Sequence, residues 1–191
     1  MSSIFIIISS RKISLTRIFF LQLIVAIACS LSTLTAYAEI KTNQGTSTVG
    51  FSGQHAGMDF DGKFERWQAT LILPPADNPN ITAVFYMSSA KTGDSIYDST
   101  LPEFDWFDVE NHARGKFLSA NITITQEGYQ VTGDLTLKDI TKPVSFMLKE
   151  NDGQLKAKFD INRLDYQIGF ESDPDAEWVS KTISMYMVIN P

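Results

Sequence analysis

The chain has 191 residues, of which 16 are Lys or Arg and 22 are Asp or Glu, so its formal net charge is −6. A net negative surface repels nucleic acid and anionic lipid headgroups, and the sequence therefore predicts neither as a partner. The single cysteine, Cys29, excludes an internal disulfide framework.

Residues 1–38 have the order of a secretory signal peptide. Basic residues precede an apolar run over 18–28, and small and polar residues follow it up to Ala36-Tyr37-Ala38. This order predicts cleavage after Ala38 and a periplasmic or secreted location. Two alternatives stay open: a retained membrane anchor, and a lipoprotein attached through Cys29, because residues 26–29 loosely resemble a lipoprotein box.

Cleavage would leave residues 39–191 as one domain of 153 residues. It removes three basic residues and no acidic ones, so the net charge changes from −6 to −9. The only cysteine leaves with the signal, and the mature chain then has no thiol chemistry. A chain of about 150 residues buries close to 70% of the surface of its unfolded state, which is enough for a substantial core.

From residue 46 onward, apolar and polar residues alternate with a period of two, which is typical of strands with one buried face. Tyr129, Val131, Leu135 and Leu137 share one parity, for example, and polar neighbours occupy the other. The alternation predicts strands over residues 46–54, 60–73, 80–89, 116–126, 129–138, 144–149, 155–162 and 179–189.

Turn signals separate these strands. Prolines lie over 74–79, and Glu127-Gly128 and Asn151–Gly153 are typical of hairpin loops. Strands joined by such short loops are antiparallel neighbours. About eight strands with one apolar face each must either stack as a sandwich or curl into a barrel.

Two stretches interrupt the alternation. Ser95–His112 contains Leu101–Phe107, which predicts a short helical segment that plugs one end of a barrel. Tyr166–Trp178 contains a run of carboxylates over 171–177, which predicts a solvated acidic loop before the last strand.

Five segments, in this order, resemble the YceI family of secreted proteins. They are Ser47–Gly57, Asp61–Trp67, Leu101–Ser119, Gly133–Val144 and Arg163–Tyr166. The most specific is Gly133–Val144, with the sequence GDLTLKDITKPV. The likeness covers nearly the whole mature chain, and one departure is Gln167, which stands where Gly is common in the family.

The resemblance implies an all-β fold, an eight-stranded antiparallel barrel of lipocalin-like shape. It also implies a hydrophobic pocket for a long apolar molecule, such as a polyisoprenoid, an isoprenoid quinone or a fatty amide. In some relatives it implies a link with a membrane cytochrome b. Physical reasoning agrees on the interior, because eight strands leave a space that side chains nearly fill or that holds one small ligand.

Eleven apolar side chains are candidates for the lining of this pocket, and packing of the barrel interior is the alternative for each of them. The candidates are Phe51, Phe60, Phe64, Trp67, Phe85, Trp106, Phe107, Phe146, Phe159, Tyr166 and Met185.

Three polar residues are candidates for the rim. His55 follows the first strand and is expected to bond either a ligand headgroup or its own turn. Arg163 and Asp165 are expected to pair with each other near the mouth or to meet a quinone oxygen. Two distant histidines without cysteines make a poor metal site, so we expect no metal and no other cofactor.

Enzyme-like strings lack their structural context. Ser88–Lys91 matches S-x-x-K and Lys91–Gly93 matches K-T-G, but the two overlap here, whereas penicillin-recognising enzymes place them on different elements. The sequence therefore predicts a binding or carrier protein without catalysis. The alternative is a partner module that docks on a membrane cytochrome b and whose cavity is incidental. A homodimer is a further possible assembly.

Overall fold

The structure is a computed structural model that describes residues 39–191. The expected signal peptide, its cleavage site and Cys29 lie outside these residues. Within them, no helix is both long and apolar enough to cross a lipid bilayer.

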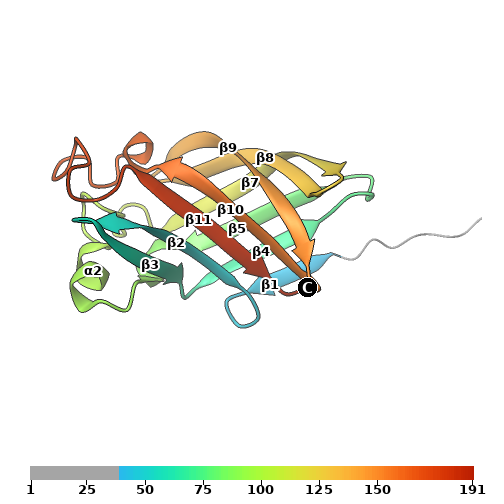
Figure 1. The fold of residues 1–191 in the computed structure, drawn as a ribbon, viewed down its shortest axis with the longest axis horizontal. Helices are drawn as coiled ribbons and strands as arrows, with labels where there is room; N and C mark the ends of the chain where they lie inside the picture. Colours follow the sequence, from blue (N-terminus) through green and yellow to red (C-terminus); the bar gives the residue numbers. More distant parts are fainter. Residues whose placement is uncertain (1–38) are drawn as a thin grey trace, which may run out of the picture. The chain divides into compact units, whose positions relative to one another are not determined.

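Eleven strands, one short α-helix and two 3₁₀ turns form the described part of the chain (Figure 1). The strands are β1 (Ile40–Asn43), β2 (Thr48–His55), β3 (Met58–Phe64), β4 (Trp67–Ile72), β5 (Asn80–Tyr86), β6 (Ala90–Lys91), β7 (Arg114–Thr125), β8 (Gly128–Leu137), β9 (Ile140–Asn151), β10 (Gln154–Asn162) and β11 (Thr182–Ile189). The helix is α2 (Ser95–Thr100), and the 3₁₀ turns are η1 (Met87–Ser89) and η2 (Arg163–Tyr166).

The alternation in the sequence gives each strand its inward face. In β8, Val131, Leu135 and Leu137 are buried, and the intervening Asp134 is exposed. All strand pairs are antiparallel, as the short loops predict. The all-β class is therefore confirmed.

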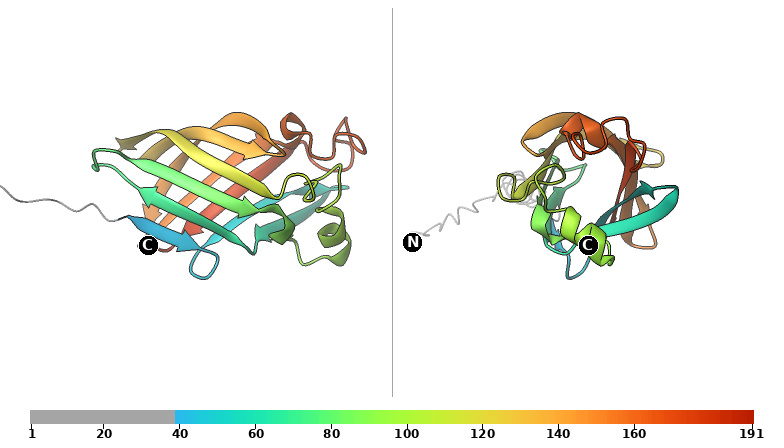
Figure 2. Two further views of the ribbon diagram at one scale, coloured as in Figure 1. Left: turned by 180° about the vertical axis from the view of Figure 1, so that it is seen from behind. Right: turned by 90° about the vertical axis from the view of Figure 1, so that its left-hand side faces the viewer.

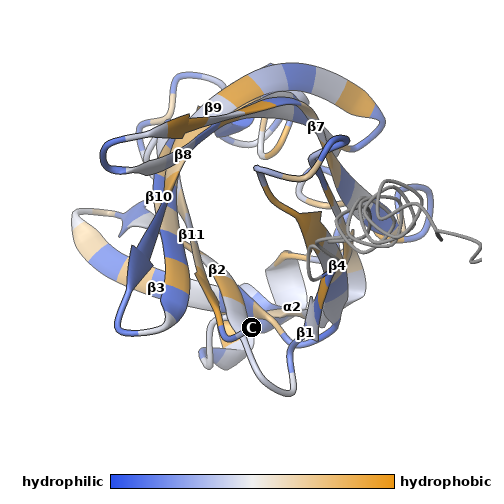
Figure 3. Ribbon diagram, turned by 90° about the vertical axis from the view of Figure 1, so that its right-hand side faces the viewer, coloured by the Kyte–Doolittle hydropathy of each residue, from blue (hydrophilic) through white to orange (hydrophobic). Residues whose placement is uncertain are grey.

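The eleven strands follow eight paths around a ring. β4 pairs with β1 and β3 pairs with β2, so β1 and β2 together form one path beside the path of β3 and β4. On the other side of β3 and β4, β5 pairs with β4 and β6 pairs with β3, so β5 and β6 form a third path. If β1–β2, β3–β4 and β5–β6 are each counted as one bent strand, every path has a neighbour on both sides. The pairing of β11 with β2 closes the ring. Figure 3, which looks along the barrel axis, shows the resulting ring. The eight-stranded barrel of the prediction thus exists as eight paths built from eleven segments.

A bend explains why the strand predicted over 60–73 is two strands. β3 ends at Phe64 and β4 begins at Trp67. At the bend between them, the backbone N–H of Glu65 donates to the carbonyl of Ser89 at 2.8 Å, and that of Arg66 donates to the Ser89 hydroxyl at 2.9 Å. Ser89 lies in η1, so the neighbouring path bends at the same level.

The barrel has two different ends, which we name by their contents. The mouth end carries α2, the β2–β3 and β8–β9 turns and the loop over 163–181 (Figure 2). The hairpin end carries the β7–β8 and β9–β10 turns and the end of β11. The strand β1, which the sequence analysis did not predict, pairs with β4 toward the hairpin end.

The seam between β9 and β10 is paired only at the hairpin end. Three residue pairs join the two strands, Gln154–Lys156 opposite Lys149–Asn151. Toward the mouth, the rings of Phe146 and Phe159 stack across the seam with centroids 4.9 Å apart, and η2 packs against β9.

The helical segment lies earlier than predicted. The helix spans Ser95–Thr100, and Leu101–Phe107 forms turns instead. Asp94 fixes the helix start, because its carboxylate accepts the backbone N–H groups of Ile96 and Tyr97 at 2.8 and 3.2 Å. Pro102 has no N–H to continue the helix, which is why the helix ends before it. The segment does cover one end of the barrel, as expected (Figure 2).

Candidate functional site

Three apolar pockets follow one another inside the barrel. The mouth pocket opens to solvent beside α2 and has a volume of about 180 Å³. The middle pocket, of about 70 Å³, shares Phe51 and Phe60 with it. The inner pocket, of about 50 Å³, lies toward the hairpin end and shares Phe85 and Met185 with the middle one. The shared walls place the three pockets in one line along the barrel.

Ten of the eleven predicted lining residues lie on the walls of these pockets. They are Phe51, Phe60, Phe64, Trp67, Phe85, Trp106, Phe107, Phe146, Phe159 and Met185. Tyr166 is the exception, because it is buried in η2 outside all three. Burial, with the nearby charge of Asp165, raises the pKa of Tyr166 to about 12.

Aromatic rings divide the interior rather than leaving a wide tunnel. Phe51 contacts Phe64 with centroids 5.5 Å apart, and Phe64 contacts Phe85 at 5.4 Å. These rings separate the middle pocket from its neighbours. The inner pocket exists because Ala69 and Ala83 face each other across β4 and β5, where larger residues would fill the space.

The mouth pocket carries one polar pair, which includes a predicted rim residue. The Nδ1 atom of His55 lies 2.7 Å from the hydroxyl of Tyr97 in α2, and both residues line this pocket. Exposed apolar side chains surround the same end of the barrel, among them Ile96, Phe104, Phe170 and Trp178. The opening of the mouth pocket therefore lies at an end of the barrel that is rich in exposed apolar side chains.

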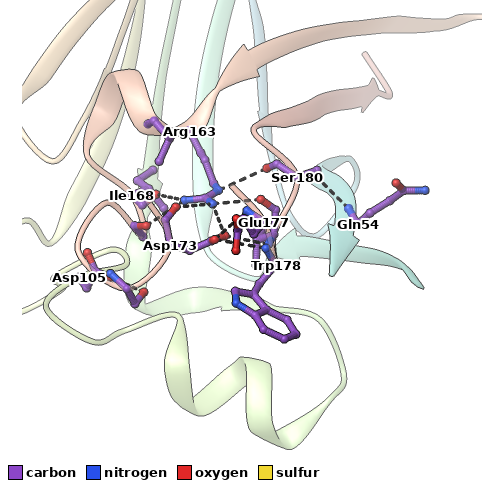
Figure 4. A network of polar contacts seen from close by, with 12 residues as sticks. Gln54, Asp105, Arg163, Ile168, Asp173, Glu177, Trp178 and Ser180 are labelled. Atoms are coloured by element: carbon purple, nitrogen blue, oxygen red, sulfur yellow. Dashed lines mark hydrogen bonds and ion pairs between the residues drawn. The ribbon is translucent and has the colours of Figure 1, made fainter. Parts of the chain in front are cut away.

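Arg163 is buried in the wall of the middle pocket, and its predicted partner is wrong. Its guanidinium donates to the carboxylate of Asp173 at 2.6 Å and to backbone carbonyls, including those of Ile168 at 2.7 Å and Val179 at 3.0 Å (Figure 4). Asp165 is exposed and accepts a hydrogen bond from Asn162 instead. Only 1% of the Arg163 surface is exposed, so the guanidinium holds the loop closed rather than presenting itself at the rim.

Asp173 is likewise not part of a solvated acidic surface, contrary to the prediction for 171–177. It is 5% exposed and accepts the backbone N–H groups of Glu177, Trp178 and Val179. Burial raises the pKa of Asp173, but these hydrogen bonds and the Arg163 charge outweigh it and lower the pKa overall. The remaining carboxylates of this stretch, such as Asp175, are exposed as expected.

A second carboxylate joins the loop to the α2 segment. Asp105 accepts the backbone N–H groups of Glu171 and Ser172, both at 2.9 Å, and the Ser172 hydroxyl at 2.5 Å. Burial raises the pKa of Asp105, and the hydrogen bonds from Ser172 and Glu171 more than reverse this, so that the pKa is lowered. The loops at the mouth are therefore fixed by two ionised carboxylates.

Two buried side-chain polar atoms have no hydrogen-bond partner among residues 39–191. They are the indole Nε1 of Trp67 and the hydroxyl of Tyr166. No cluster of three or more potential metal ligands occurs in this part of the chain.

The comparison with known proteins decides the family. The sequence model of one protein family, the YceI-like domain, matches residues 41–190, almost all of the described barrel. The chain belongs to the YceI family. It is also 35% identical to a UPF0312 protein of Photorhabdus laumondii over 104 residues, which is 50% of this chain and 52% of that protein. The chain thus matches about half the length of this curated relative.

Solved structures share the fold of this YceI-family chain. BcnA of Burkholderia cenocepacia superposes with a TM-score of 0.68 at 21% identity, covering 76% of this chain and 96% of BcnA. A domain from Saccharophagus degradans, described as a polyisoprenoid-binding domain implicated in plant cell wall breakdown, superposes with a TM-score of 0.58 at 13% identity. That comparison covers 80% of this chain and 96% of the domain.

The structure explains the most YceI-like segment, Gly133–Val144. A side chain at Gly133 would collide with the carbonyl oxygen of Leu118, so β7 and β8 need glycine there. Lys138 and Asp139 have φ of 48° and 57° and form the tight β8–β9 turn. The Lys138 ammonium donates to the carbonyls of Phe104, Asp105 and Gln167 at 3.0–3.3 Å. The segment therefore joins the barrel to both mouth loops.

The departure of the chain from the family at Gln167 also has a structural meaning. Gln167 ends η2 with φ of 55° and ψ of 33°, the left-handed conformation that glycine adopts most easily. The glycine that the family resemblance implies at this position would suit the same turn.

Sequence analysis missed lining residues of two kinds. Leu135, Ile161 and Ile183 lie on the inward parity of predicted strands, so alternation alone could have identified them. Val179 belongs to the same kind, because it shares the inward parity of the strand predicted over 179–189. Tyr97 lies in the α2 segment, where no periodicity exists, and the sequence carried no signal for it.

Proposed function

We propose that this protein binds one long apolar molecule, such as a polyisoprenoid, an isoprenoid quinone or a fatty amide, inside the barrel and carries it without chemical change. The observation that carries the proposal is the line of apolar pockets that begins at the solvent-open mouth and ends beside Trp67. The polyisoprenoid-binding description of the Saccharophagus domain, which has the same fold, supports the class of ligand.

The driving force is burial of the ligand's apolar surface. An elongated ligand that loses about 500 Å² of apolar surface to the barrel gains about 12 kcal/mol before losses of motional freedom. Those losses are about 4–15 kcal/mol, so at their lower end about 8 kcal/mol remains, which corresponds to micromolar binding. Because the middle and inner pockets are small, a long chain needs the rings of Phe64 and Phe85 to turn aside.

The proposed route of entry is the mouth end. The mouth pocket is the one of the three that α2 borders, and exposed side chains such as Ile96 and Trp178 surround it. The expected signal peptide supports a periplasmic location, where a carrier of this kind would shield a water-insoluble molecule.

Native mass spectrometry of the purified mature protein tests the proposal. We expect a bound apolar mass, or binding of added long-chain quinones and polyprenols. Ala83→Phe should fill the inner pocket and weaken this binding at least tenfold, while Leu118→Ser, on the outer face of β7, should leave it unchanged. Absence of any long apolar ligand from the unmodified protein would refute the proposal.

A partner module that docks on a membrane cytochrome b is the second candidate. The exposed side chains of Phe104, Phe170 and Trp178 at the mouth, with the exposed carboxylates of Asp175 and Glu177, favour an interaction surface there. Reversing the charges of Asp175 and Glu177 should then weaken the complex, and Ala83→Phe should not.

A further inference from the structure

Two arginines flank one tyrosine on the outer face of the barrel, at the end of β5. The guanidinium carbon of Arg66 lies 3.7 Å from the centre of the Tyr86 ring, and that of Arg114 lies 5.3 Å from it. The sheet brings them together, because Tyr86 pairs with Arg114 of β7 and its backbone N–H donates to the carbonyl of Arg66 at 3.0 Å. A guanidinium that stacks on a ring keeps its N–H donors available for a carboxylate or a phosphate, since they lie in its own plane.

This pair of cations has no counter-ion within the described part of the chain. Arg66 and Arg114 are exposed, and none of the ion pairs among these residues includes either of them. Lys116, two residues after Arg114 on the same face of β7, adds a third exposed cation that is also outside the ion pairs. In a chain with a net charge of −6, three neighbouring cations without acidic partners indicate a site for an anion.

A polar groove lies next to these cations on the outer face of β1, β4 and β5, which are neighbours in the sheet (Figure 1). Its volume is about 310 Å³, which is the size at which small-molecule sites begin. Val84 connects it to the cations, because it lines the groove, pairs with Lys116 and shares the face of Tyr86 two residues further on. The amide and hydroxyl side chains of the lining include Asn43, Gln68, Thr70 and Thr82.

The groove lies on a face of the sheet and not at an edge. β4 pairs with β1 and β5, and β5 also pairs with β7, so the backbone groups beneath the groove are used within the sheet. An extended peptide therefore finds no strand edge to pair with. Hydroxyl and amide side chains both donate and accept hydrogen bonds, and sugar hydroxyls need partners of both kinds. An extended anionic surface, such as nucleic acid or an anionic bilayer, is repelled by the net negative charge, whereas a compact anion is not excluded by it.

We propose that this outer face binds a sugar that carries a carboxylate or a phosphate group. The anionic group lies between the guanidinium groups of Arg66 and Arg114, and the sugar hydroxyls meet Gln68 and the threonines of the groove. The inference goes beyond the carrier function, because the outward side chains form this site while the inward side chains line the apolar pockets. The two sites are therefore tested separately.

Titrations of ¹⁵N-labelled protein compare two anionic sugars, glucuronate and glucose 6-phosphate, with neutral glucose and with acetate and inorganic phosphate. We expect at least one anionic sugar to shift the amide signals of Gln68, Val84 and Arg114. It should bind about tenfold more tightly than glucose, which lacks the charge, and than the matching simple anion, which lacks the hydroxyls.

Three substitutions locate the site. Arg66→Gln and Arg114→Gln should each weaken binding of the anionic sugar about tenfold, because each removes charge-assisted hydrogen bonds. Thr82→Val should weaken binding of the sugar and leave binding of acetate and phosphate unchanged. The matched control is Lys158→Gln, which removes an exposed cation from the outer face of β10 and should change nothing.

Two results would refute the sugar site directly: neither anionic sugar shifts these signals, or both arginine variants bind them as tightly as the unmodified protein. Equal affinity for an anionic sugar and its simple anion would mean that the arginines attract any small anion and that the groove takes no part. Binding of phosphatidylglycerol vesicles or of an oligoglutamate peptide through Arg114, without binding of either sugar, would replace the proposal by a membrane or a protein partner. None of these results changes the binding of long polyprenols and quinones, on which the carrier proposal is judged.

Discussion

The two ends of the barrel are closed by different kinds of interaction. At the hairpin end, short turns join the strands, and side chains such as Leu148, with no exposed surface, fill the interior. At the mouth, a buried arginine, two carboxylates and Lys138 hold long loops together through backbone groups (Figure 4). Apolar packing thus stabilises the hairpin end. Ionised side chains stabilise the loops at the mouth, where a ligand would pass.

The largest expected effect is at the mouth. Asp173→Ala should destabilise the protein by about 3–5 kcal/mol, because it leaves the Arg163 charge buried without its counter-ion. Denaturant unfolding measures this loss. Asp175→Ala, an exposed carboxylate in the same loop, is the control and should change stability by less than about 0.5 kcal/mol. Equal effects of the two substitutions would mean that the buried pair does not hold the loop.

At the hairpin end, creating a cavity by substitution should lower the free energy of unfolding by a comparable amount, and this loss should not depend on pH. Leu148→Ala should lower the free energy of unfolding by about 2–5 kcal/mol, because the space left by the side chain stays largely empty. The same loss is expected at pH 7 and at pH 4. A loss that changed strongly with pH would break the contrast between the two ends.

Acid should destabilise the loops at the mouth, because two carboxylates hold them. The pKa values of Asp105 and Asp173 are lowered in the folded protein, so their contribution to stability is complete above the unfolded value of about 3.9. It is lost as the pH falls through the lower folded values. Asp105→Asn should cost about 1.5 kcal/mol at pH 7 and flatten the stability curve below pH 4. An unchanged curve in unfolding experiments would contradict this assignment.

The smallest expected effect is an increase in stability. Gln167→Gly places glycine in a left-handed conformation and should stabilise the protein by about 0.5–1 kcal/mol. In a domain of this size the melting temperature then rises by roughly 1–4 °C. Lys142→Gly, in the extended strand β9, is the contrasting control and should lower it.

Most of the barrel could be predicted from alternation, because a strand with one buried face must repeat every two residues. The bend at Glu65 and Arg66 could not, since it depends on contacts with Ser89 on the next path. The aromatic lining residues were found because large rings on the inward parity reach the barrel axis. Tyr166 was misplaced because η2 has no such parity.

The polar half of the site was the harder part. Arg163 was selected, but its partner lies ten residues further on, in a loop whose path only the fold determines. Proximity in sequence favoured Asp165 and was misleading. The parity of Trp67 placed it inside, yet no pattern in the sequence says whether its indole N–H has a partner.

The seam between β9 and β10 is the part of the barrel wall with the fewest backbone hydrogen bonds between neighbouring strands. Along most of its length the described strands are held by the stacked rings of Phe146 and Phe159 and by η2, without a ladder of backbone hydrogen bonds. Stretching such a wall breaks weak contacts only, and both rings border the inner pocket. If the barrel widens to admit a bulky ligand, the seam between β9 and β10 is therefore where the fewest backbone hydrogen bonds have to break.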